Sequence, residues 1–344
     1  MDKENITNQS EPVFVHSTYQ AAEDILWYVQ MIFYTCIVVV GVTGNFLVCR
    51  AIFSQARRKT NDMFILNLAV TDLGTCAISI PFDMAEQISK HFLFGKLMCS
   101  LLYPLQTILM GTSVLTLLAV SIERYKAIVT PLQPKLRGKL AKAMLIGSWV
   151  LSVAVVAPYM VVLKYVNRQC IESWPVPAHA KTFTFVLFVV LYAVPMVIIT
   201  YCYVRVLRRI HRDRPVSLLV ASSLMSNIAI KRRARQNLRM IKMFVTAVVA
   251  FALCLLPNHV VWLWNDFGDG HEKPYFGIVL IFSNTLIYTN SIVNPFIFGK
   301  LQCGLCGGRE SQLFSLRYRY SSTFRPRSRG LLFIGRQNRK KSTE

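Results

Sequence analysis

Seven runs of apolar residues, each long enough to cross a lipid bilayer, constrain the fold of this chain more than any other feature. The hydrocarbon core of a bilayer is about 30 Å thick, so a helix needs about 20 residues to cross it. Within a membrane a helix also satisfies its own backbone hydrogen bonds. The runs lie at about residues 27–53, 63–88, 98–130, 141–163, 182–209, 238–264 and 275–299. The sequence therefore predicts an all-α membrane protein, a seven-transmembrane helix bundle.

The composition supports a membrane location. Of the 344 residues, 53% are hydrophobic and 16% are charged, whereas soluble proteins average about 25% charged residues. A water-soluble enzyme is therefore not expected. The loops also contain no nucleophile–base constellation and no spacing typical of metal ligands, so we expect the chain to have no catalytic activity of its own.

The charge of the chain is strongly positive and unevenly distributed. There are 39 Lys and Arg residues against 17 Asp and Glu residues, a net charge of +22. With the N-terminus outside and the C-terminus inside, 32 basic and 5 acidic residues fall on the cytoplasmic face, 7 basic and 11 acidic residues fall outside, and Asp72 lies near mid-membrane. Basic residues favour the cytoplasmic side of membrane proteins. We therefore predict this topology, and we prefer it to nucleic-acid binding as the explanation of the charge.

The chain shows no internal repeat and no second globular region. We expect one membrane domain over residues 25–308, preceded by an extracellular tail, 1–24, and followed by a basic cytoplasmic tail, 309–344. In the first tail, the triplets that begin at Asn5 and Asn8 match the glycosylation acceptor pattern, although so short a pattern also occurs by chance.

Two further segments are interpreted as cytoplasmic. The uncharged stretch Val216–Ile230 is short for a span, and we expect a loop there. From Lys300 onward the chain has 11 basic and 2 acidic residues. Such a segment next to a membrane contacts anionic lipid in some proteins, and a solvated disordered tail is the alternative.

Charged and polar residues inside the predicted spans indicate a functional interior. Placing a carboxylate near the bilayer centre costs free energy unless polar partners or a functional role compensate for it, and Asp72 is such a residue. At 100° per residue, Asp83 and Glu86 return to within about 20° and 40° of the face of Asp72. We expect all three side chains to face the inside of the bundle, although Pro81 interrupts this helix and can rotate the register.

The run 98–130 carries a second polar stripe. Gln106, Ser113 and Arg124 share one face within about 20°, and Gln106 and Arg124 are about 27 Å apart along the helix. In the run 275–299, Asn290 and Asn294 lie one turn apart, next to a proline that frees backbone carbonyls. A hinge or an ion site is one interpretation, and ordinary hydrogen bonds between neighbouring helices are the other.

One or more short motifs occur in every predicted span. In chain order they are Gly44-Asn45, Leu68-Ala69-Val70-Thr71-Asp72, Cys99, Glu123-Arg124-Tyr125, Trp149, Pro195 followed by Tyr203, Phe251-Ala252-Leu253-Cys254-Leu255-Leu256-Pro257, and Asn294-Pro295. Together they resemble the rhodopsin-type (class A) family of G-protein-coupled receptors, and the resemblance covers nearly all of residues 25–308. It implies a multi-pass protein of the plasma membrane whose partners are a heterotrimeric G protein, arrestin and membrane lipids.

The resemblance also implies several covalent features and one ion. A disulfide is expected between Cys99 and Cys170, and a short amphipathic helix after the last span. Cys303 and Cys306 in that helix resemble palmitoylation sites, with unmodified thiols as the alternative. No cofactor is implied apart from a sodium ion, for which the oxygen ligands are Asp72, Ser113, Asn290 and Asn294. The alternative there is a network of water molecules.

Residues that resemble the switch of the family lie toward the predicted cytoplasmic side. Those implied in G-protein coupling are Glu123, Arg124, Tyr125, Tyr203, Phe251, Leu255, Pro257, Asn294, Pro295 and Phe298. Arg124 is expected to contact the G protein once the run 238–264 moves outward. The chain departs from the family pattern at Leu255 (usually Trp), Phe298 (usually Tyr), Phe92 (usually Trp) and Asn237 (acidic in some members).

The remaining polar residues near the predicted mouth indicate the ligand. Tyr288 replaces the lysine that an opsin needs, and Gln106 replaces the aspartate of amine receptors. Gln106 resembles the peptide-binding branch of the family, as does the segment Cys170–Pro175. The outer surface is net acidic, which favours a cationic ligand. We expect a short peptide that carries Arg or Lys, with a C-terminus that is either amidated or a free acid. The ligand-binding residues that we expect are Asp83, Glu86, Gln106, Glu172, Asn258, His259 and Tyr288, although a neutral, packed His259 is an alternative.

Two other classes of function remain at this point. A transporter or channel would use Asp72 and the asparagines as an ion path, but the chain has no inverted repeat and no paired broken helices. A non-signalling or constitutively active receptor is suggested by the departures at Leu255 and Phe298. Ion flux in vesicles and G-protein activation would separate these classes from a ligand-driven receptor.

Overall fold

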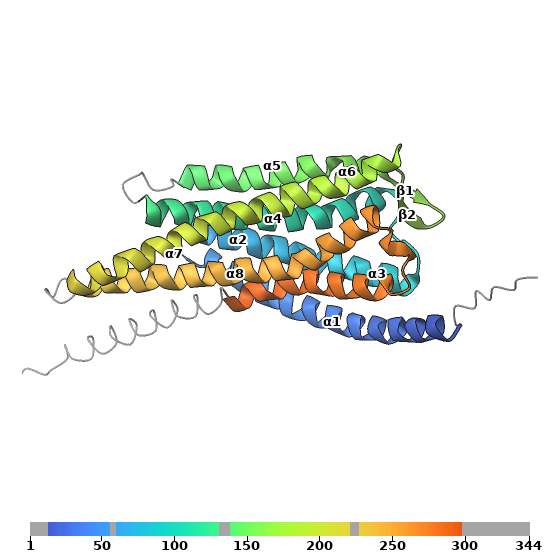
Figure 1. Cartoon of the computed structure of the whole chain (residues 1–344), viewed down its shortest axis with the longest axis horizontal. Helices are drawn as coiled ribbons and strands as arrows, with labels where there is room; N and C mark the ends of the chain where they lie inside the picture. Colours follow the sequence, from blue (N-terminus) through green and yellow to red (C-terminus); the bar gives the residue numbers. More distant parts are fainter. Residues whose placement is uncertain (1–12, 56–59, 131–137, 221–226, 298–344) are drawn as a thin grey trace, which may run out of the picture. The chain divides into compact units, whose positions relative to one another are not determined.

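The computed structural model describes residues 13–55, 60–130, 138–220 and 227–297, and side chains within 24–55, 60–130, 138–212 and 238–297. In this part of the chain nearly all residues are helical, and the helices form one bundle (Figure 1). Phe298, Cys303, Cys306, Asn5 and Asn8, the predicted helix after the last span and the predicted basic tail lie outside the described residues, as does the side chain of Asn237.

The elements follow one another along the chain with short connections. They are α1 (Val13–Phe53), α2 (Thr60–Gly74), the π-helix η1 (Thr75–Ser79), α3 (Ile80–Ser89), α4 (Gly95–Val129), α5 (Gly138–Val162), β1 (Leu163–Val166), β2 (Gln169–Glu172), α6 (Pro177–Phe188), the π-helix η2 (Val189–Ala193), α7 (Val194–Val220), α8 (Asn227–Phe267), the 3-10 helix η3 (Gly270–Glu272) and a last helix, Phe276–Ile297.

These elements make seven helices that are long and apolar enough to cross a membrane, which confirms the predicted bundle. The second span joins α2, η1 and α3, and the fifth joins α6, η2 and α7. Two boundaries differ from the expectation. α1 begins at Val13, inside the predicted tail, and α7 and α8 extend into the segment predicted to be a loop, reaching Val220 and starting at Asn227.

The π-helix η1 changes the register of the second span. A π-turn holds one more residue than an α-turn, so residues after it are rotated relative to an uninterrupted helix. Pro81 follows η1 directly, at the first turn of α3, where a proline is tolerated. The change of register expected near Pro81 therefore includes η1, which ends directly before it, and Asp72 and Asp83 still line one cavity.

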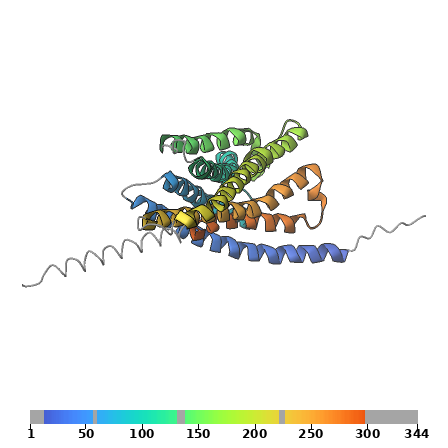
Figure 2. The same cartoon turned by 60° about the vertical axis from the view of Figure 1, so that its left-hand side comes forward.

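α4 is the central helix of the bundle. In its apolar segment 67% of the residues are buried, against 50% or fewer in each of the other spans. α1 lies at the edge of the bundle in two views that differ by 60° (Figures 1 and 2). The buried stripe of α4 contains Ser113 and Arg124, as the sequence predicted for an inward-facing helix.

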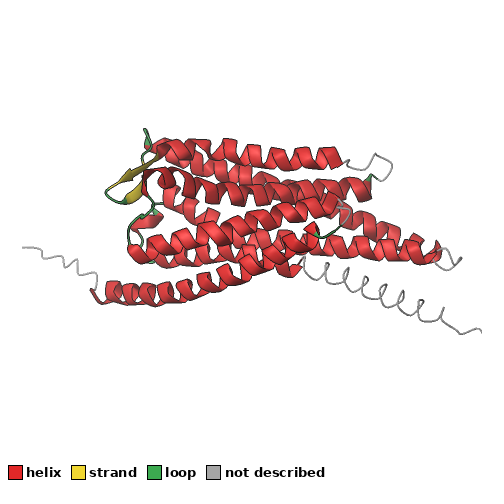
Figure 3. Ribbon diagram, turned by 180° about the vertical axis from the view of Figure 1, so that it is seen from behind, coloured by secondary structure: helices red, strands yellow, loops and turns green. Residues whose placement is uncertain are grey.

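The two strands form an antiparallel hairpin at one end of the bundle (Figure 3). Asn167 and Arg168, between the strands, have φ angles of 51° and 61°, the left-handed conformation that a two-residue hairpin turn requires. Cys170 in β2 forms a disulfide with Cys99 at the start of α4, which confirms the predicted pair. The backbone N–H of Phe92 also donates to the carbonyl of Arg168 at 2.8 Å. This end, called the hairpin end below, is therefore fixed to α4.

Candidate ligand cavity and candidate switch

A cavity of about 300 Å³ opens among the spans at the hairpin end and reaches the middle of the bundle. Its outer lining includes Glu172 of β2 and Tyr159 of α5, and its deepest lining includes Asp72 and Ser113. The expected ligand residues that line it are Asp83, Gln106, Glu172, Asn258, His259 and Tyr288. The structure thus brings together six of the seven predicted positions, and the seventh, Glu86, contacts a residue of the lining.

The carboxylates at the hairpin end are held by neutral donors. Asp83 accepts hydrogen bonds from the Tyr288 hydroxyl and, at 2.7 Å, from Nε2 of Gln106. Glu86 accepts a hydrogen bond from the hydroxyl of Tyr103 at 2.5 Å, and Tyr103 lines the cavity. Neutral donors orient these anions without cancelling their charge.

No basic side chain compensates the three carboxylates Asp83, Glu86 and Glu172. None of them forms an ion pair in the part of the chain whose side chains are described, and the cavity lining contains neither Lys nor Arg. Glu172 instead accepts a hydrogen bond from the indole N–H of Trp174 at 2.7 Å. The cavity therefore presents unpaired negative charge at its mouth.

The opposite wall of the cavity is formed by α8 and the last helix. Nδ2 of Asn258 donates to Oδ1 of Asn284 at 2.9 Å. His259 is 8% exposed and packs beside the ring of Tyr192, with 4.9 Å between centroids. Its Nε2 has no hydrogen-bond partner among the described residues. His259 is thus both a packed side chain and a cavity residue with a free polar atom.

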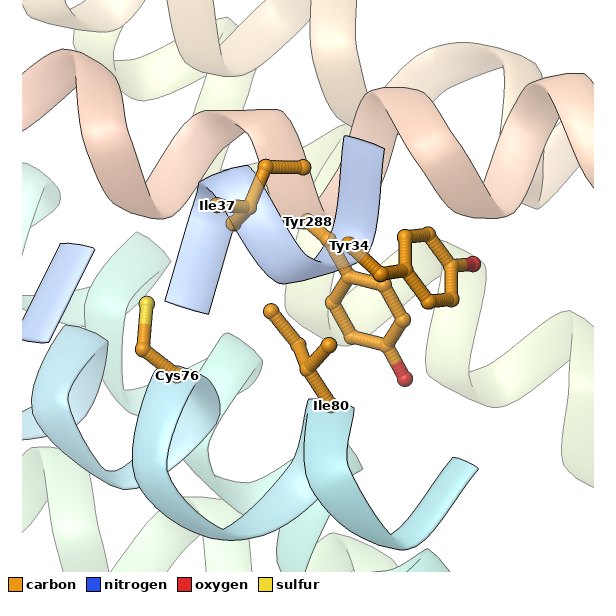
Figure 4. Packing of buried hydrophobic residues seen from close by; sticks show 5 residues of the cluster. All are labelled: Tyr34, Ile37, Cys76, Ile80 and Tyr288. Atoms are coloured by element: carbon orange, nitrogen blue, oxygen red, sulfur yellow. The ribbon is translucent and has the colours of Figure 1, made fainter. Parts of the chain in front are cut away.

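A cluster of buried residues, Tyr34, Ile37, Cys76, Ile80 and Tyr288, supports the cavity from the side of α1 (Figure 4). Tyr34 packs edge-on against Tyr288 with 5.2 Å between ring centroids, and its hydroxyl accepts a hydrogen bond from Gln30 at 2.7 Å. Because Tyr288 in turn contacts Asp83, α1 helps to position the acidic group.

Three of the predicted ion ligands, Asp72, Ser113 and Asn290, line the deepest part of the cavity, and the fourth, Asn294, contacts Asp72 from outside the lining. Asp72 is 2% exposed, and its Oδ2 accepts a hydrogen bond from Nδ2 of Asn294 at 2.8 Å. The hydroxyl of Ser113 lies 2.7 Å from that of Thr71. Oδ1 of Asn290 and Oδ1 of Asn294 are buried without hydrogen-bond partners among the described residues. Unpaired oxygens beside one buried carboxylate fit a small hard cation.

At the other end of the bundle, Arg124 is buried and forms an ion pair with its neighbour Glu123. Its Nη2 also donates to Oδ1 of Asn61 in α2 at 2.6 Å. The ring of Tyr125 lies near that of Tyr201, with 6.2 Å between centroids, and Tyr203 is buried in α7. Four predicted switch residues, Glu123, Arg124, Tyr125 and Tyr203, therefore lie toward the end of the bundle remote from the hairpin end.

Two further predicted switch side chains, both in α8, lie between the two ends. Phe251 and Leu255 in α8 are each 1% exposed and line the cavity. Pro257 follows inside the same helix. Consequently α8 forms one wall of the cavity and continues toward the region of Arg124.

The model of the 7 transmembrane receptor (rhodopsin family) matches residues 44–298 of the chain. The chain belongs to this family. The receptor is 30% identical to a QRFP-like peptide receptor of Branchiostoma floridae, over 79% of its own length and 74% of the relative. It is also 30% identical to the human galanin receptor type 1 (80% and 78% covered) and 31% identical to the human urotensin-2 receptor (76% and 65% covered). With seven spans, it is a multi-pass protein of the plasma membrane.

Several residues that shape the receptor were not selected from its sequence. Asn67 accepts a hydrogen bond from the indole N–H of Trp149 at 3.0 Å and donates to Thr116 at 2.8 Å, joining three spans. Asn61 and Tyr103 likewise contact predicted site residues. For Asn67 and Tyr103 the available signal was a polar group within an apolar run, whereas Asn61 precedes the run 63–88 and gave no such signal.

Proposed function

We propose that this receptor binds an extracellular cationic peptide and, in response, activates a heterotrimeric G protein through an outward movement of α8. The uneven charge of the sequence supports an extracellular hairpin end and an intracellular Arg124. Sodium at the Asp72 cluster would act as a modulator, and arrestin and anionic lipids would be further intracellular partners.

The observation that carries this proposal is the unpaired charge of Asp83, Glu86 and Glu172 around the cavity mouth. A guanidinium or ammonium group of a ligand would form charge-assisted hydrogen bonds there, which are about twice as strong as neutral ones. A free C-terminal carboxylate would meet no basic partner in the described lining. A peptide whose inserted end is amidated, or carries the basic residue, therefore suits the cavity better.

The amide and imidazole groups of the opposite wall would fix the orientation of the peptide. Nε2 of His259 and the side chains of Asn258 and Gln106 can exchange hydrogen bonds with a peptide backbone or a terminal amide. The relatives give independent support, since one is named a peptide receptor and others are receptors for galanin and urotensin-2.

Two helices would carry the response from the cavity to the G protein. α4 bears both Gln106 and Arg124, about 27 Å apart. α8 contributes Leu255 and Phe251 to the floor of the cavity. A ligand that binds more tightly when α8 has moved would shift the population toward that state, in which Arg124 becomes accessible to the G protein.

The proposal is tested by screening short basic peptides, in amidated and free-acid forms, on cells that express the full-length receptor, with second messengers as the readout. We expect amidated basic peptides to activate and acidic peptides to be inactive. For substitutions of the carboxylates at the cavity mouth, Asp269→Asn is the matched control. Asp269 is exposed, lies outside the cavity lining and has a φ of 51° that asparagine tolerates. Ion flux through the protein in vesicles, without G-protein activation, would contradict the proposal.

A further inference from the structure

Asn61, near the start of α2, contacts two other spans at the Arg124 end of the bundle. Its Oδ1 accepts a hydrogen bond from Nη2 of Arg124 in α4 at 2.6 Å. Its Nδ2 donates to the Sδ atom of Met240 in α8 at 3.2 Å. The two ends of one amide group thus join the arginine of the switch to the helix that is proposed to move.

The other contact of Arg124 cannot restrain α8. Nε of Arg124 donates to Glu123, which is its neighbour in the same helix. An ion pair within α4 orients the guanidinium but leaves α8 free. Among the described side chains, the polar connection between Arg124 and α8 passes through Asn61.

We infer that Asn61 is a positioning residue that restrains the inner part of α8 by linking Met240 to Arg124. This inference rests on the proposed function, because it assumes that α8 moves outward when the receptor activates a G protein. Outward movement of α8 separates Met240 from Asn61, so the bond between their side chains must break in the active state.

The chemistry of the two bonds indicates which one opens. The bond from Arg124 to Asn61 has a charged donor and a short distance, whereas the thioether sulfur of Met240 is a weak acceptor. Opening therefore occurs between Asn61 and Met240, while Asn61 stays with Arg124. Because the broken bond is weak, we expect the restraint to change ligand-independent activation by about two- to tenfold.

The test compares the full-length receptor with Asn61→Ala, Met240→Leu and the double variant, each in lipid nanodiscs without ligand. Met240→Leu keeps the side-chain size and removes the acceptor. Thr130→Ala is the control, since Thr130 lies near the same end of α4 and its hydroxyl donates to the carbonyl of Lys126 in its own helix. Nucleotide exchange on added G protein is one readout.

The second readout is a distance and needs no G protein. Azide-bearing residues at Lys139 of α5 and Leu238 of α8, both exposed, would carry spin labels without involving the cysteines. In both single variants we expect a larger fraction of molecules with a long distance than in the unaltered receptor. We also expect nucleotide exchange on the G protein to rise about two- to tenfold. The double variant should do no more than Asn61→Ala alone, because that variant already removes the bond to Met240.

Asn61→Asp tests the contact with Met240 while keeping the contact with Arg124. A carboxylate still accepts from Arg124 but has no N–H to donate to Met240, so this variant should also lengthen the distance. Unchanged distances in Met240→Leu and Asn61→Asp, or strictly additive effects in the double variant, would overturn the inference. Longer distances in a receptor that activates no G protein would support the restraint and contradict the proposed function.

Discussion

Gln106 of α4 donates a hydrogen bond to Asp83 of α3 at 2.7 Å, and both side chains line the cavity. The second oxygen of Asp83 accepts from Tyr288. Both donors are neutral, so Asp83 is held in one orientation while its charge remains available. A binding group that is oriented before the ligand arrives loses less entropy on binding.

Neutralising the acidic mouth should weaken binding of a basic peptide. For Asp83→Asn and for Glu86→Gln, we expect affinity to fall by about 10- to 100-fold, because a hydrogen bond to a charged group contributes about 1.5–3 kcal/mol. Radioligand displacement with an active basic peptide measures this change. Asp269→Asn should change affinity less than about twofold, since an exposed charge pair contributes little. Equal losses in all three variants would argue against this binding mode.

Sodium dependence should require Asp72. If the oxygens of Asn290 and Asn294 bind sodium together with Asp72, replacing NaCl by N-methylglucamine chloride should change agonist affinity in the unaltered receptor. Asp72→Asn removes the only carboxylate of the cluster and should abolish that change. Peptide titrations in the two salts at equal ionic strength give the comparison. Sodium dependence that survives in Asp72→Asn would contradict the assignment.

Gly41 should not tolerate a side chain. A Cβ atom there would collide with the Sγ atom of Cys76 in η1, because α1 and the second span approach each other closely. We expect Gly41→Ala to destabilise the receptor by about 1–3 kcal/mol, the usual cost of overpacking. Cys76→Ala in the same chain removes the colliding sulfur and should restore part of the thermal stability in detergent. No recovery in the double variant would show that the glycine has another role.

The disulfide should stabilise the hairpin end more than the Arg124 end. Cys99→Ser with Cys170→Ser frees β1 and β2 from α4, while the contact of Arg124 with Asn61 is remote from it. We expect peptide affinity to fall and hydrogen exchange to increase in residues 163–172. Hydrogen exchange of the backbone near Arg124 should be the same as in the unaltered receptor. Uniformly faster exchange throughout the bundle would instead indicate global destabilisation.

The spans and their inward faces could be predicted because the bilayer imposes simple rules. Length and apolarity fix a membrane helix, and a 100° rotation per residue places Gln106, Ser113 and Arg124 on one side. All three lie as expected, with Ser113 and Arg124 buried. The disulfide was predicted from resemblance to the family and not from geometry.

The partners of these side chains could not be predicted in the same way. Periodicity says which face a residue occupies, but the pairing of Asn61 with Arg124 depends on the relative heights of two helices. η1 likewise depends on local backbone geometry, so a rotation near Pro81 could be expected from the sequence but the π-helix beside it could not. The first span begins at Asp24, close to the predicted residue 27, whereas α1 itself extends back to Val13. Apolarity over the length of a bilayer predicts a span and does not report on helix beyond it.

A charge exchange between receptor and ligand tests the central claim most directly. Peptide-stimulated nucleotide exchange would be measured for the unaltered receptor and for Glu86→Lys, each with an active basic peptide and with its analogue in which the basic residue is replaced by Glu. We predict that Glu86→Lys loses response to the basic peptide and gains response to the acidic analogue. If both receptors respond to the basic peptide with equal potency, the acidic mouth does not recognise the ligand and the account is contradicted.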